Sequence, residues 1–325
     1  MYIGGIDIGG TKCAALIGEL QDGGIRPGAR VAFPTPATPE AALAQLAEAL
    51  SEAAAREGIS PEALAAIGVS CGGPLSSAEG RILSPPNLPG WDDVHVCEFF
   101  TARFGVPCGL QNDANACALA EWRFGAGRGT RNMVFLTFGT GLGAGLILDG
   151  RLYAGTNDNA GEVGHVRLSS HGPVGYGKAG SFEGFCSGGG LAQLARTRAH
   201  EAIQRGAPFA FCPDMAALDS LSAKSVALAA DAGDADALAI YAECGQMLGR
   251  GLSVIIDILN PEAIVIGSVY ARSEHLLRET ALAEIRREAL PQAVAVCRLL
   301  PAALGDAIGD YAALSVGANL LAEAK

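Results

Sequence analysis

Residues 2–20 read YIGGIDIGGTKCAALIGEL, which is an apolar strand pattern, a glycine turn and a second apolar strand. Residues 132–148 repeat this order as NMVFLTFGTGLGAGLIL, so that IDIGGTKCAALIG is answered by LTFGTGLGAGLIL. Self-similarity about half a chain apart is typical of an internal duplication. The two stretches therefore predict two related α/β domains.

The composition limits the classes of protein to which the chain can belong. Its 325 residues are 50% hydrophobic, which is enough for a large core and favours two domains over one. A net charge of -11 argues against nonspecific binding to nucleic acid or to an anionic membrane surface. The nine cysteines are scattered and contain no CxxC pair, which indicates free thiols in a reducing cytosol. Because no signal peptide or membrane-spanning run is visible, we expect a cytoplasmic soluble protein.

Helix and strand signals alternate in the first half of the chain, and helix signals dominate the second half. Thr38 and Pro39 predict the start of a helix that ends at Gly58, because Thr is a favoured N-cap, Pro suits the first turn and Gly ends helices. The other main predictions are strands at 66–71, 107–111 and 263–267, and helices at 94–104, 116–122, 238–259 and 309–324.

The two glycine turns, Asp7–Lys12 and Thr137–Gly141, are candidate phosphate-binding sites. Small residues leave backbone N–H groups and threonine hydroxyls free to bind phosphate oxygens, and two such turns across a cleft would clamp ATP. Gly139–Ala144 matches GxGxxA, but a dinucleotide-binding turn must open a helix, and a short apolar strand pattern follows here. Asp7 is suited to hold Mg²⁺ through water. The alternative is two ordinary β-hairpins without a ligand.

The segment Gln111–Asn115 places a carboxylate, Asp113, between two amides where a strand gives way to a helix. In the simplest interpretation Asp113 is a helix N-cap, a role that contributes about 1 kcal/mol. In the functional interpretation it is a general base that takes a proton from an attacking hydroxyl. Asn112 and Asn115 can orient hydroxyl groups without competing for that proton.

Residues 159–183, NAGEVGHVRLSSHGPVGYGKAGSFE, combine two carboxylates and two histidines with many glycines. The polar side chains are Glu162, His165, His171 and Glu183. Glycines let the backbone approach a ligand, and ionised carboxylates accept hydrogen bonds from hydroxyl groups. The stretch is therefore a candidate wall for a polyhydroxylated ligand. Taken alone, it could equally be a mobile surface loop.

Seven motifs, in this order along nearly the whole chain, resemble the ROK family of sugar kinases and repressors. They are DIGGTK at 7–12, CGGPL at 71–75, SPPNLPGW at 84–91, QNDANA at 111–116, TFGTGLGAG at 137–145, GEVGH at 161–165 and LNPEAIVIG at 259–267. The resemblance implies an ASKHA-type fold of two RNase-H-like α/β domains, with ATP and sugar meeting in the cleft between them. It implies one domain of residues 1–115 plus 309–325 and a larger one of residues 116–308.

The resemblance also assigns roles to individual residues. It implies that Asp113 is the catalytic base and that sugar binding involves Gly73, Asn87, Asn112, Asp113, Glu162, His165 and Glu183. For the phosphates, Mg²⁺ and adenosine of the nucleotide it implies Asp7, Gly9, Gly10, Thr11, Lys12, Thr137, Gly139, Thr140, Gly141 and Gly267. Ser268 stands where the family usually has a second glycine.

One family feature is missing. Members usually carry three cysteines after the GExGH motif, which bind structural zinc together with its histidine; here Val174, Tyr176 and Ser181 occupy those positions. Structural zinc needs four thiolate or imidazole ligands, and only His165 remains. We therefore predict that structural zinc is absent, that Tyr176 and Phe182 fill the space by apolar packing, and that Cys186 is a structural thiol.

The resemblance implies an ATP- and Mg²⁺-dependent kinase that phosphorylates a hexose, with the 6-hydroxyl of glucose or a related sugar as the first expectation. An N-acetylated hexosamine or another hexose is the alternative acceptor. A sugar-responsive repressor and a catalytically inactive sugar sensor are further alternatives, but only six residues precede Asp7 and the chain is acidic. No nucleic-acid or membrane partner is expected, and the family implies a homodimer or homotetramer.

Overall fold

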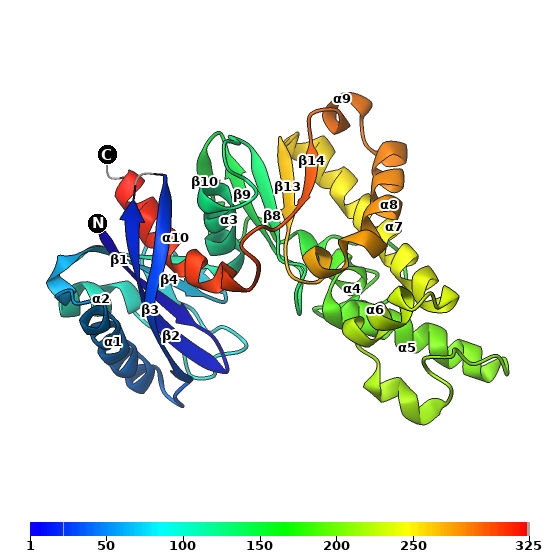
Figure 1. The fold of residues 1–325 in the computed structure, drawn as a ribbon, viewed down its shortest axis with the longest axis horizontal. Helices are drawn as coiled ribbons and strands as arrows, with labels where there is room; N and C mark the ends of the chain where they lie inside the picture. Colours follow the sequence, from blue (N-terminus) through cyan, green and yellow to red (C-terminus); the bar gives the residue numbers. More distant parts are fainter. Residues whose placement is uncertain (22, 324–325) are drawn as a thin grey trace. The chain divides into compact units, whose positions relative to one another are not determined.

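The computed structural model describes residues 1–21 and 23–323, which form two compact units (Figure 1). The first unit contains Met1–Arg131, Gly145–Ala160 and Ala303–Lys325, and the second contains Asn132–Ala144 and Gly161–Ala302. Both units mix helices with strands, so the predicted α/β class is confirmed. Of the helices described, none is long and apolar enough to cross a membrane. The domain boundaries expected at 115/116 and 308/309 stay a prediction.

The first unit is built on a five-stranded sheet with the order β3-β2-β1-β4-β7. Its strands are β1 (Tyr2–Ile8), β2 (Lys12–Gln21), β3 (Gly24–Pro34), β4 (Leu64–Cys71) and β7 (Cys108–Asn112). β1 runs antiparallel to β2 and parallel to β4, which in turn runs parallel to β7. The predicted first hairpin is therefore confirmed, and Ile8 pairs with Cys13 across its turn.

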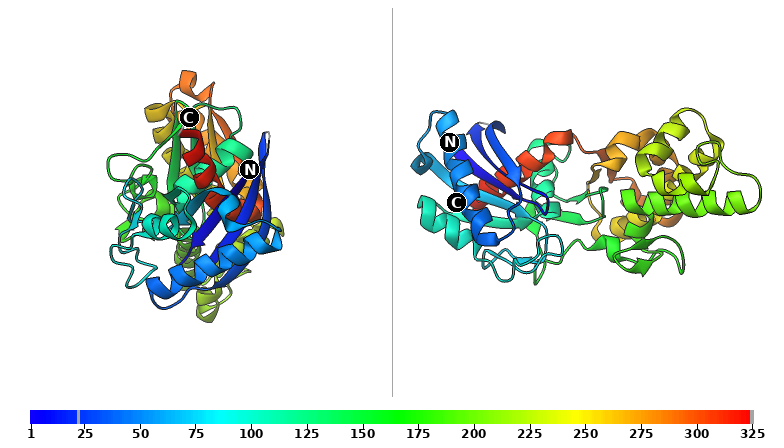
Figure 2. Two further views of the ribbon diagram at one scale, coloured as in Figure 1. Left: turned by 90° about the vertical axis from the view of Figure 1, so that its left-hand side faces the viewer. Right: turned by 90° about the horizontal axis from the view of Figure 1, so that it is seen from below.

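Helices cover both faces of this sheet (Figures 1 and 2). On one face, α1 (Pro39–Arg56) and α2 (Val96–Phe104) pack around a core that includes Leu46 and Phe100. On the other face, α10 (Ile308–Glu323) packs through Leu314. The N-cap prediction for α1 is confirmed, because Thr38 accepts the backbone N–H of Ala41 at 3.3 Å. The remaining elements in this part of the fold are α3 (Asp113–Phe124), β5 (Leu75–Ser76), β6 (Arg81–Ile82), β9 (Ala144–Leu148), β10 (Arg151–Tyr153) and 3₁₀ turns at Pro61–Ala63 and Gly305–Ala307.

The second unit contains three parallel strands, β8 (Met133–Leu136), β13 (Ala263–Ile266) and β14 (Arg298–Pro301). They belong to a sheet with the order β10-β9-β8-β13-β14. The helices are α4 (Phe182–Phe185), α5 (Gly188–Gln204), α6 (Ala223–Asp231), α7 (Ala235–Leu259), α8 (Val269–Glu288) and α9 (Pro291–Val294), with 3₁₀ turns at Val163–His165 and Met215–Ser220 and a small hairpin of β11 (Val174–Gly175) and β12 (Lys178–Ala179). The helix and strand predicted at 238–259 and 263–267 are confirmed as α7 and β13.

Glycines set the close packing of α7. A side chain at Gly245 would collide with Thr280 of α8, and one at Gly251 would collide with the ring of Phe182. Phe182 is only 1% exposed, and it ties the short helix α4 to α7. Because α4 also carries Glu183, this packing fixes the position of a predicted sugar ligand.

Candidate active site

The ends of three parallel strands bring the first unit's predicted residues to one edge of its sheet. Ile8 of β1 is in register with Cys71 of β4, and Cys71 is in register with Asn112 of β7. Asp7 directly precedes Ile8, Gly73 lies two residues after Cys71, and Asp113 directly follows Asn112. Parallel strands present their carboxyl ends at the same edge, which is where ligands bind in open α/β sheets.

The turn between β1 and β2 is held from outside by Thr35. Its hydroxyl donates to the carbonyl oxygen of Gly9 at 2.5 Å, and its N–H donates to the carbonyl of Thr11 at 3.1 Å. Within the turn, the N–H of Gly9 donates to the carbonyl of Lys12 at 3.1 Å. Thr11 and Lys12 are exposed and remain accessible to a ligand. The sequence had not singled out Thr35, because its role depends on a neighbour 26 residues away.

The same turn touches residues predicted for the sugar. A side chain at Gly10 would collide with the backbone of Asn87, so a glycine is required there for this contact. The side-chain oxygen of Asn87 is 3.5 Å from the position that a Cβ would occupy at Gly72. Gly73, the next residue, is exposed and precedes a cis peptide bond to Pro74. The structure thus gathers Gly10, Asn87 and the Gly72–Pro74 segment.

Asp7 is half-buried, and its surroundings determine its charge. Burial raises the pKa of Asp7 from 3.8 to about 6; Arg30 opposes the rise, while Asp310 adds to it. Lys12 lowers the pKa and Asp113 raises it to smaller extents. Arg30 is itself bound to Asp310, with Nε and Oδ1 2.8 Å apart. Arg30 and Asp310 are functional candidates that the sequence did not reveal.

Asp113 begins helix α3 but does not cap it. The cap is Asn112, whose side-chain oxygen accepts the N–H of Asn115 at 2.7 Å, so the interpretation of Asp113 as N-cap is wrong. The Asp113 side chain is exposed yet crowded by protein, and this desolvation raises its pKa, opposed by the N–H groups of Ala114 and of Asp113 itself. The carboxylate is therefore accessible and a stronger proton acceptor than a free aspartate.

Asn115, in contrast, turns inward. It is fully buried, and its amide donates to Gln111 Oε1 at 3.1 Å. Its side-chain oxygen has no partner within residues 1–21 and 23–323. Asn115 therefore braces the start of α3, and the expectation that it could orient a hydroxyl group is not supported by this position.

In the second unit, the turn Thr137–Gly141 is closed by its own backbone and side chains. The Thr137 hydroxyl accepts the N–H of Gly143 at 2.9 Å, and the N–H of Gly139 donates to the carbonyl of Gly141 at 3.0 Å. The carbonyl of Gly139 also accepts the N–H of Gly188, the first residue of α5, at 2.8 Å. Thr140 is exposed at the tip.

Gly267 lies beside the start of this turn. Its N–H donates to the carbonyl of Leu136 at 3.0 Å. The next residue, Ser268, places its hydroxyl oxygen 3.6 Å from where a Cβ built on Gly139 would lie. Ser268 has φ 54° and ψ -114°, a conformation that favours glycine. The departure from the family's second glycine therefore leaves a strained backbone at the edge of the turn.

Glu183 joins the predicted sugar wall to the phosphate turn. Its Oε2 accepts the N–H of Leu142 at 3.0 Å and is 2.7 Å from the Cβ position at Gly141. Gly164, between Glu162 and His165, lies against Leu142. A Cβ atom built on Gly164 would be 3.3 Å from the Glu183 side chain. The structure thus brings the GEVGH segment, Glu183 and the turn together within one unit.

One expectation is wrong for the segment in which family members usually bind zinc. Tyr176 is 78% exposed, so the prediction that it fills the space by apolar packing is wrong. Its ring lies against His165 instead, with ring centroids 6.0 Å apart. Ser181 is buried and caps α4, accepting the N–H of Gly184 at 3.0 Å. Cys186 is buried and donates to the carbonyl of Cys244, as a structural thiol would.

No group of three or more potential metal-ligating side chains occurs in the part of the chain that the structure describes. Val174 and Tyr176 project into solvent at two of the three cysteine positions. His171, in the same stretch, has its Nδ1 2.8 Å from the hydroxyl oxygen of Ser170. The absence of structural zinc remains a prediction.

Comparison with known proteins identifies the family. The model of the ROK family matches residues 3–324. The chain is 34% identical over 264 residues to a glucokinase of Streptomyces coelicolor, covering 81% of this chain and 80% of that protein. It is 34% identical over 297 residues to an N-acetylmannosamine kinase of Salmonella typhimurium, covering 90% of each.

The fold is shared with a solved structure of a ROK family glucokinase from Streptomyces griseus in complex with glucose and AMPPNP. The TM-score is 0.75 at 28% identity, with 98% of this chain and 99% of that one covered. The predicted two-domain ASKHA-type α/β fold is therefore confirmed. With a family match over nearly its whole length and relatives above 30% identity, the chain belongs to the ROK family.

Proposed function

We propose that the chain transfers the γ-phosphoryl group of ATP to the 6-hydroxyl of glucose or a related hexose, with Asp113 as general base. The coarser activity follows from its family: the chain is an ATP-dependent sugar kinase. The observation that carries the finer proposal is the setting of Asp113, an accessible carboxylate at a helix start whose pKa is raised by the surrounding protein.

Asp113 would accept the hydroxyl proton as the sugar oxygen attacks the phosphorus in line. The proton moves to a carboxylate oxygen of Asp113, the new bond forms between the sugar oxygen and the γ-phosphorus, and the bond to the β-phosphate oxygen breaks. The backbone N–H groups of the two glycine turns and the Lys12 ammonium would stabilise charge on the phosphoryl oxygens. These side chains and turns position and stabilise, and Asp113 alone exchanges a proton.

Asp7 fits the requirements for a ligand of a nucleotide-bound Mg²⁺. A pKa of about 6 leaves its carboxylate ionised at pH 7.5, and Mg²⁺ is typically held by only one or two carboxylates together with phosphates and water. When bound, Mg²⁺ would neutralise part of the phosphate charge. We assign Thr11, Thr137, Gly139 and Thr140 to the phosphates and Gly267 to the edge of the adenosine site.

The sugar would be held by groups that bind its hydroxyls. In this proposal they are Gly73, Asn87, Asn112, Glu162, His165 and Glu183. Their contribution is positioning, which can account for several kcal/mol of a reaction barrier. The same set could accept an N-acetylated hexosamine, and the similarity to an N-acetylmannosamine kinase supports that sugar as the alternative acceptor.

Three further parts of the proposal extend beyond the site. We propose domains of residues 1–115 plus 309–325 and of residues 116–308, a homodimer or homotetramer, and a cytoplasmic location. The oligomeric state is measurable by light scattering of the purified protein, and a monomer at working concentration contradicts it.

The decisive experiment is an acceptor screen with purified protein and Mg-ATP, following ADP release. The panel should contain glucose, mannose, allose, fructose, N-acetylglucosamine and N-acetylmannosamine. We expect glucose or a close relative to give the highest kcat/KM, and Asp113→Asn to lower kcat by roughly 10²- to 10⁴-fold. The matched control is Asp219→Asn, which changes an exposed aspartate far from the proposed site in sequence. ADP release that no sugar stimulates, or an unchanged rate in Asp113→Asn, contradicts the mechanism.

A further inference from the structure

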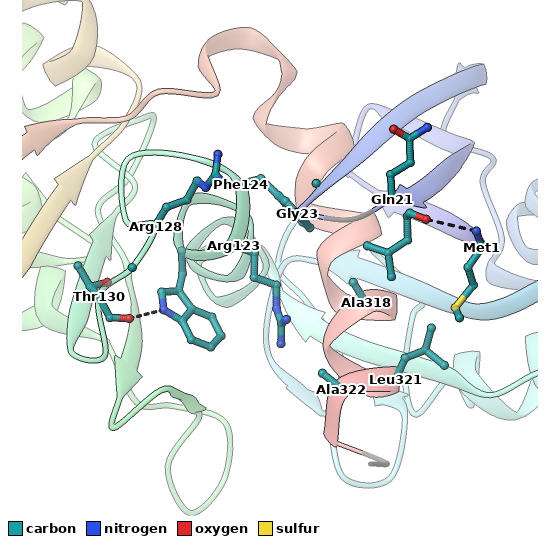
Figure 3. A pocket seen from close by; sticks show the side chains of 14 residues that line it. Met1, Gln21, Gly23, Arg123, Phe124, Arg128, Thr130, Ala318, Leu321 and Ala322 are labelled. Atoms are coloured by element: carbon teal, nitrogen blue, oxygen red, sulfur yellow. Dashed lines mark hydrogen bonds between the residues drawn. The ribbon is translucent and has the colours of Figure 1, made fainter.

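Each unit contains a cavity, and the cavity of the second unit adjoins the segment that carries proposed sugar ligands. The cavity of the first unit lies between α3 and α10 (Figure 3), and no described residue of its wall is a proposed ligand of sugar or nucleotide. In the second unit, Gln193 of α5 and Pro173, which directly precedes β11, line the cavity. This wall brings helix α5 next to the hairpin of β11 and β12, which lies between His165 and Glu183 in sequence.

Gln193 holds the backbone of β11 with both ends of its side-chain amide. Its Oε1 accepts the N–H of Val174 at 3.0 Å, and its Nε2 donates to the carbonyl oxygen of Val174 at 2.9 Å. The N–H of Gly180 donates to the carbonyl of Pro173 at 2.9 Å, so the next residue, Val174, directs its own N–H and carbonyl away from β12. The half-buried Gln193 therefore takes the place of a further strand at this edge of the hairpin.

Strand β11 in turn lies against Glu183. A Cβ atom built on Gly175 would be 2.8 Å from the Cβ of Glu183 and 2.6 Å from the backbone nitrogen of Gly184. The buried Ser181 joins the same two segments, because its hydroxyl donates to the carbonyl of Gly175 at 3.4 Å and accepts the N–H of Gly184 at 3.0 Å. Because no side chain larger than a hydrogen atom fits at Gly175, the position of β11 fixes the position of Glu183.

The other strand of the hairpin is tied to the GEVGH segment. The Lys178 ammonium donates to the carbonyl oxygen of His165 at 2.7 Å. The guanidinium of Arg167 donates to the carbonyl oxygen of Ala179 at 2.7 Å. Hydrogen bonds from charged donors are stronger than those between neutral groups. The hairpin is therefore bonded to α5 on one side and to the backbone of a proposed sugar ligand on the other.

Helix α5 is itself anchored at the second glycine turn. The N–H of Gly188, its first residue, donates to the carbonyl of Gly139 at 2.8 Å. A Cβ atom built on Gly190 would be 1.9 Å from the carbonyl oxygen of Gly184, so the helix start packs directly on α4. Gln193 follows Gly188 by five residues, which is about 7.5 Å along the helix axis. The amide that holds β11 thus projects from a helix whose start is fixed.

We propose that Gln193 is a positioning residue of the sugar site: it holds β11 in place, and β11 holds Glu183 where its carboxylate binds a sugar hydroxyl. The inference rests on the proposed function of Glu183 as a sugar ligand. Because Glu183 also accepts the N–H of Leu142, a displaced β11 should disturb both the sugar wall and the second glycine turn. The sequence does not reveal Gln193, because its partner Val174 lies 19 residues away.

Amide hydrogen exchange, followed by mass spectrometry without any substrate, tests the contact itself. Gln193→Met keeps the length of the side chain but cannot bond to Val174, so residues 171–180 should exchange at least tenfold faster than in the natural chain. Gln204→Met, the same change at the exposed last residue of α5, is the matched control and should leave this exchange unaltered. If Gln193→Met does not fold, as judged by circular dichroism, Gln193→Glu decides, because it has no N–H to donate to the Val174 carbonyl. Exchange that neither variant at this position accelerates overturns the proposal.

A double-mutant cycle tests whether Gln193 acts through Glu183. In the natural chain, Gln193→Met should raise the KM for glucose and for ATP at least threefold. In the Glu183→Ala background the same change should raise neither constant further. An equal rise in both backgrounds overturns the proposal, because Gln193 would then act by another route.

The two measurements separate failure of this proposal from failure of the proposed function. If Glu183→Ala alone leaves both KM values unchanged, the sugar role of Glu183 is wrong and the positioning role of Gln193 is overturned with it. Faster exchange in Gln193→Met would still show that this side chain holds the hairpin. Unchanged exchange together with raised KM values in Glu183→Ala overturns the role of Gln193 alone.

Discussion

The carboxylate of Glu183 accepts the backbone N–H of Leu142 at 3.0 Å. Glu183 is a proposed sugar ligand, and Leu142 directly follows the glycine turn proposed for phosphate. A group that binds sugar hydroxyls would therefore also hold the end of the nucleotide turn. Because one carboxylate serves both, filling the sugar site should affect the order of the turn and thus the binding of ATP.

Replacing Glu183 by Ala should weaken the binding of both ATP and sugar. Loss of a side chain that binds only the sugar would weaken sugar binding alone. A hydrogen bond to a charged group contributes about 1.5–3 kcal/mol, so we expect each KM to rise by roughly 10- to 150-fold. Steady-state kinetics with ATP and glucose varied separately measure this. Glu48→Ala, on the exposed side of α1, is the control and should change neither constant. A rise confined to the sugar KM contradicts the coupling.

Asp7→Asn should make the protein more stable at neutral pH while impairing nucleotide use. Burial raises the pKa of Asp7 to about 6 in the fold, against an ordinary value of 3.8 for an aspartate. Because the pKa is raised in the fold, the contribution of Asp7 to the free energy of unfolding is fully present below pH 3.8. This contribution falls by up to about 3 kcal/mol as the pH rises through 6. Removing the charge should therefore raise Tm more at pH 7.5 than at pH 5, measured by differential scanning calorimetry. A Tm that falls at pH 7.5, with Asp219→Asn unchanged, contradicts this account of Asp7.

The sequence predicts those parts of the fold that local patterns specify. The hairpin of β1 and β2, the Thr38 cap and helix α7 follow from strand and helix periodicity and from capping preferences. β3 was not predicted, because Gly24–Pro34 contains Pro27 and Gly28 and resembles a loop. Such residues are tolerated at the edge of a sheet, which is where β3 lies.

Residues of the candidate site also divide into those that the sequence predicts and those that only the fold reveals. Asp7 and Asp113 lie within motifs, so the sequence reveals them, whereas Thr35, Arg30 and Asp310 act through neighbours that only the fold brings close. For Tyr176 the sequence led to a prediction that is wrong. Its aromatic character suggested packing, but a position at φ 44° in the β11–β12 turn leaves the side chain in solvent. Local pattern therefore identifies motif residues better than the residues that support them.

Thr35→Val should loosen the first glycine turn. The change removes the hydroxyl that donates to the Gly9 carbonyl but keeps the shape of the side chain and the backbone bond to Thr11. We expect a loss of about 1 kcal/mol in the free energy of unfolding and a several-fold rise in the KM for ATP. Thr35→Ser retains the hydroxyl and is the matched control. If the serine and valine variants behave alike in urea unfolding and in ATP kinetics, this hydroxyl does not support the turn.

Ser268→Gly should stabilise the chain by relieving the strained backbone beside the second turn. Ser268 has φ 54° and ψ -114°, which glycine adopts without a steric penalty, and residues held in such regions cost about 1–3 kcal/mol. Its hydroxyl also accepts a hydrogen bond from Arg272 at 3.2 Å, so part of the gain is offset when the side chain is removed. We expect a net gain of about 1 kcal/mol, which is a rise of roughly 2 °C in Tm. Ser268→Ala is the matched variant, because it loses the same hydrogen bond but keeps the Cβ that strains the backbone. Calorimetry should therefore rank the glycine variant above the natural chain and the alanine variant below it. A glycine variant less stable than the natural chain would show that the hydrogen bond to Arg272 outweighs the strain.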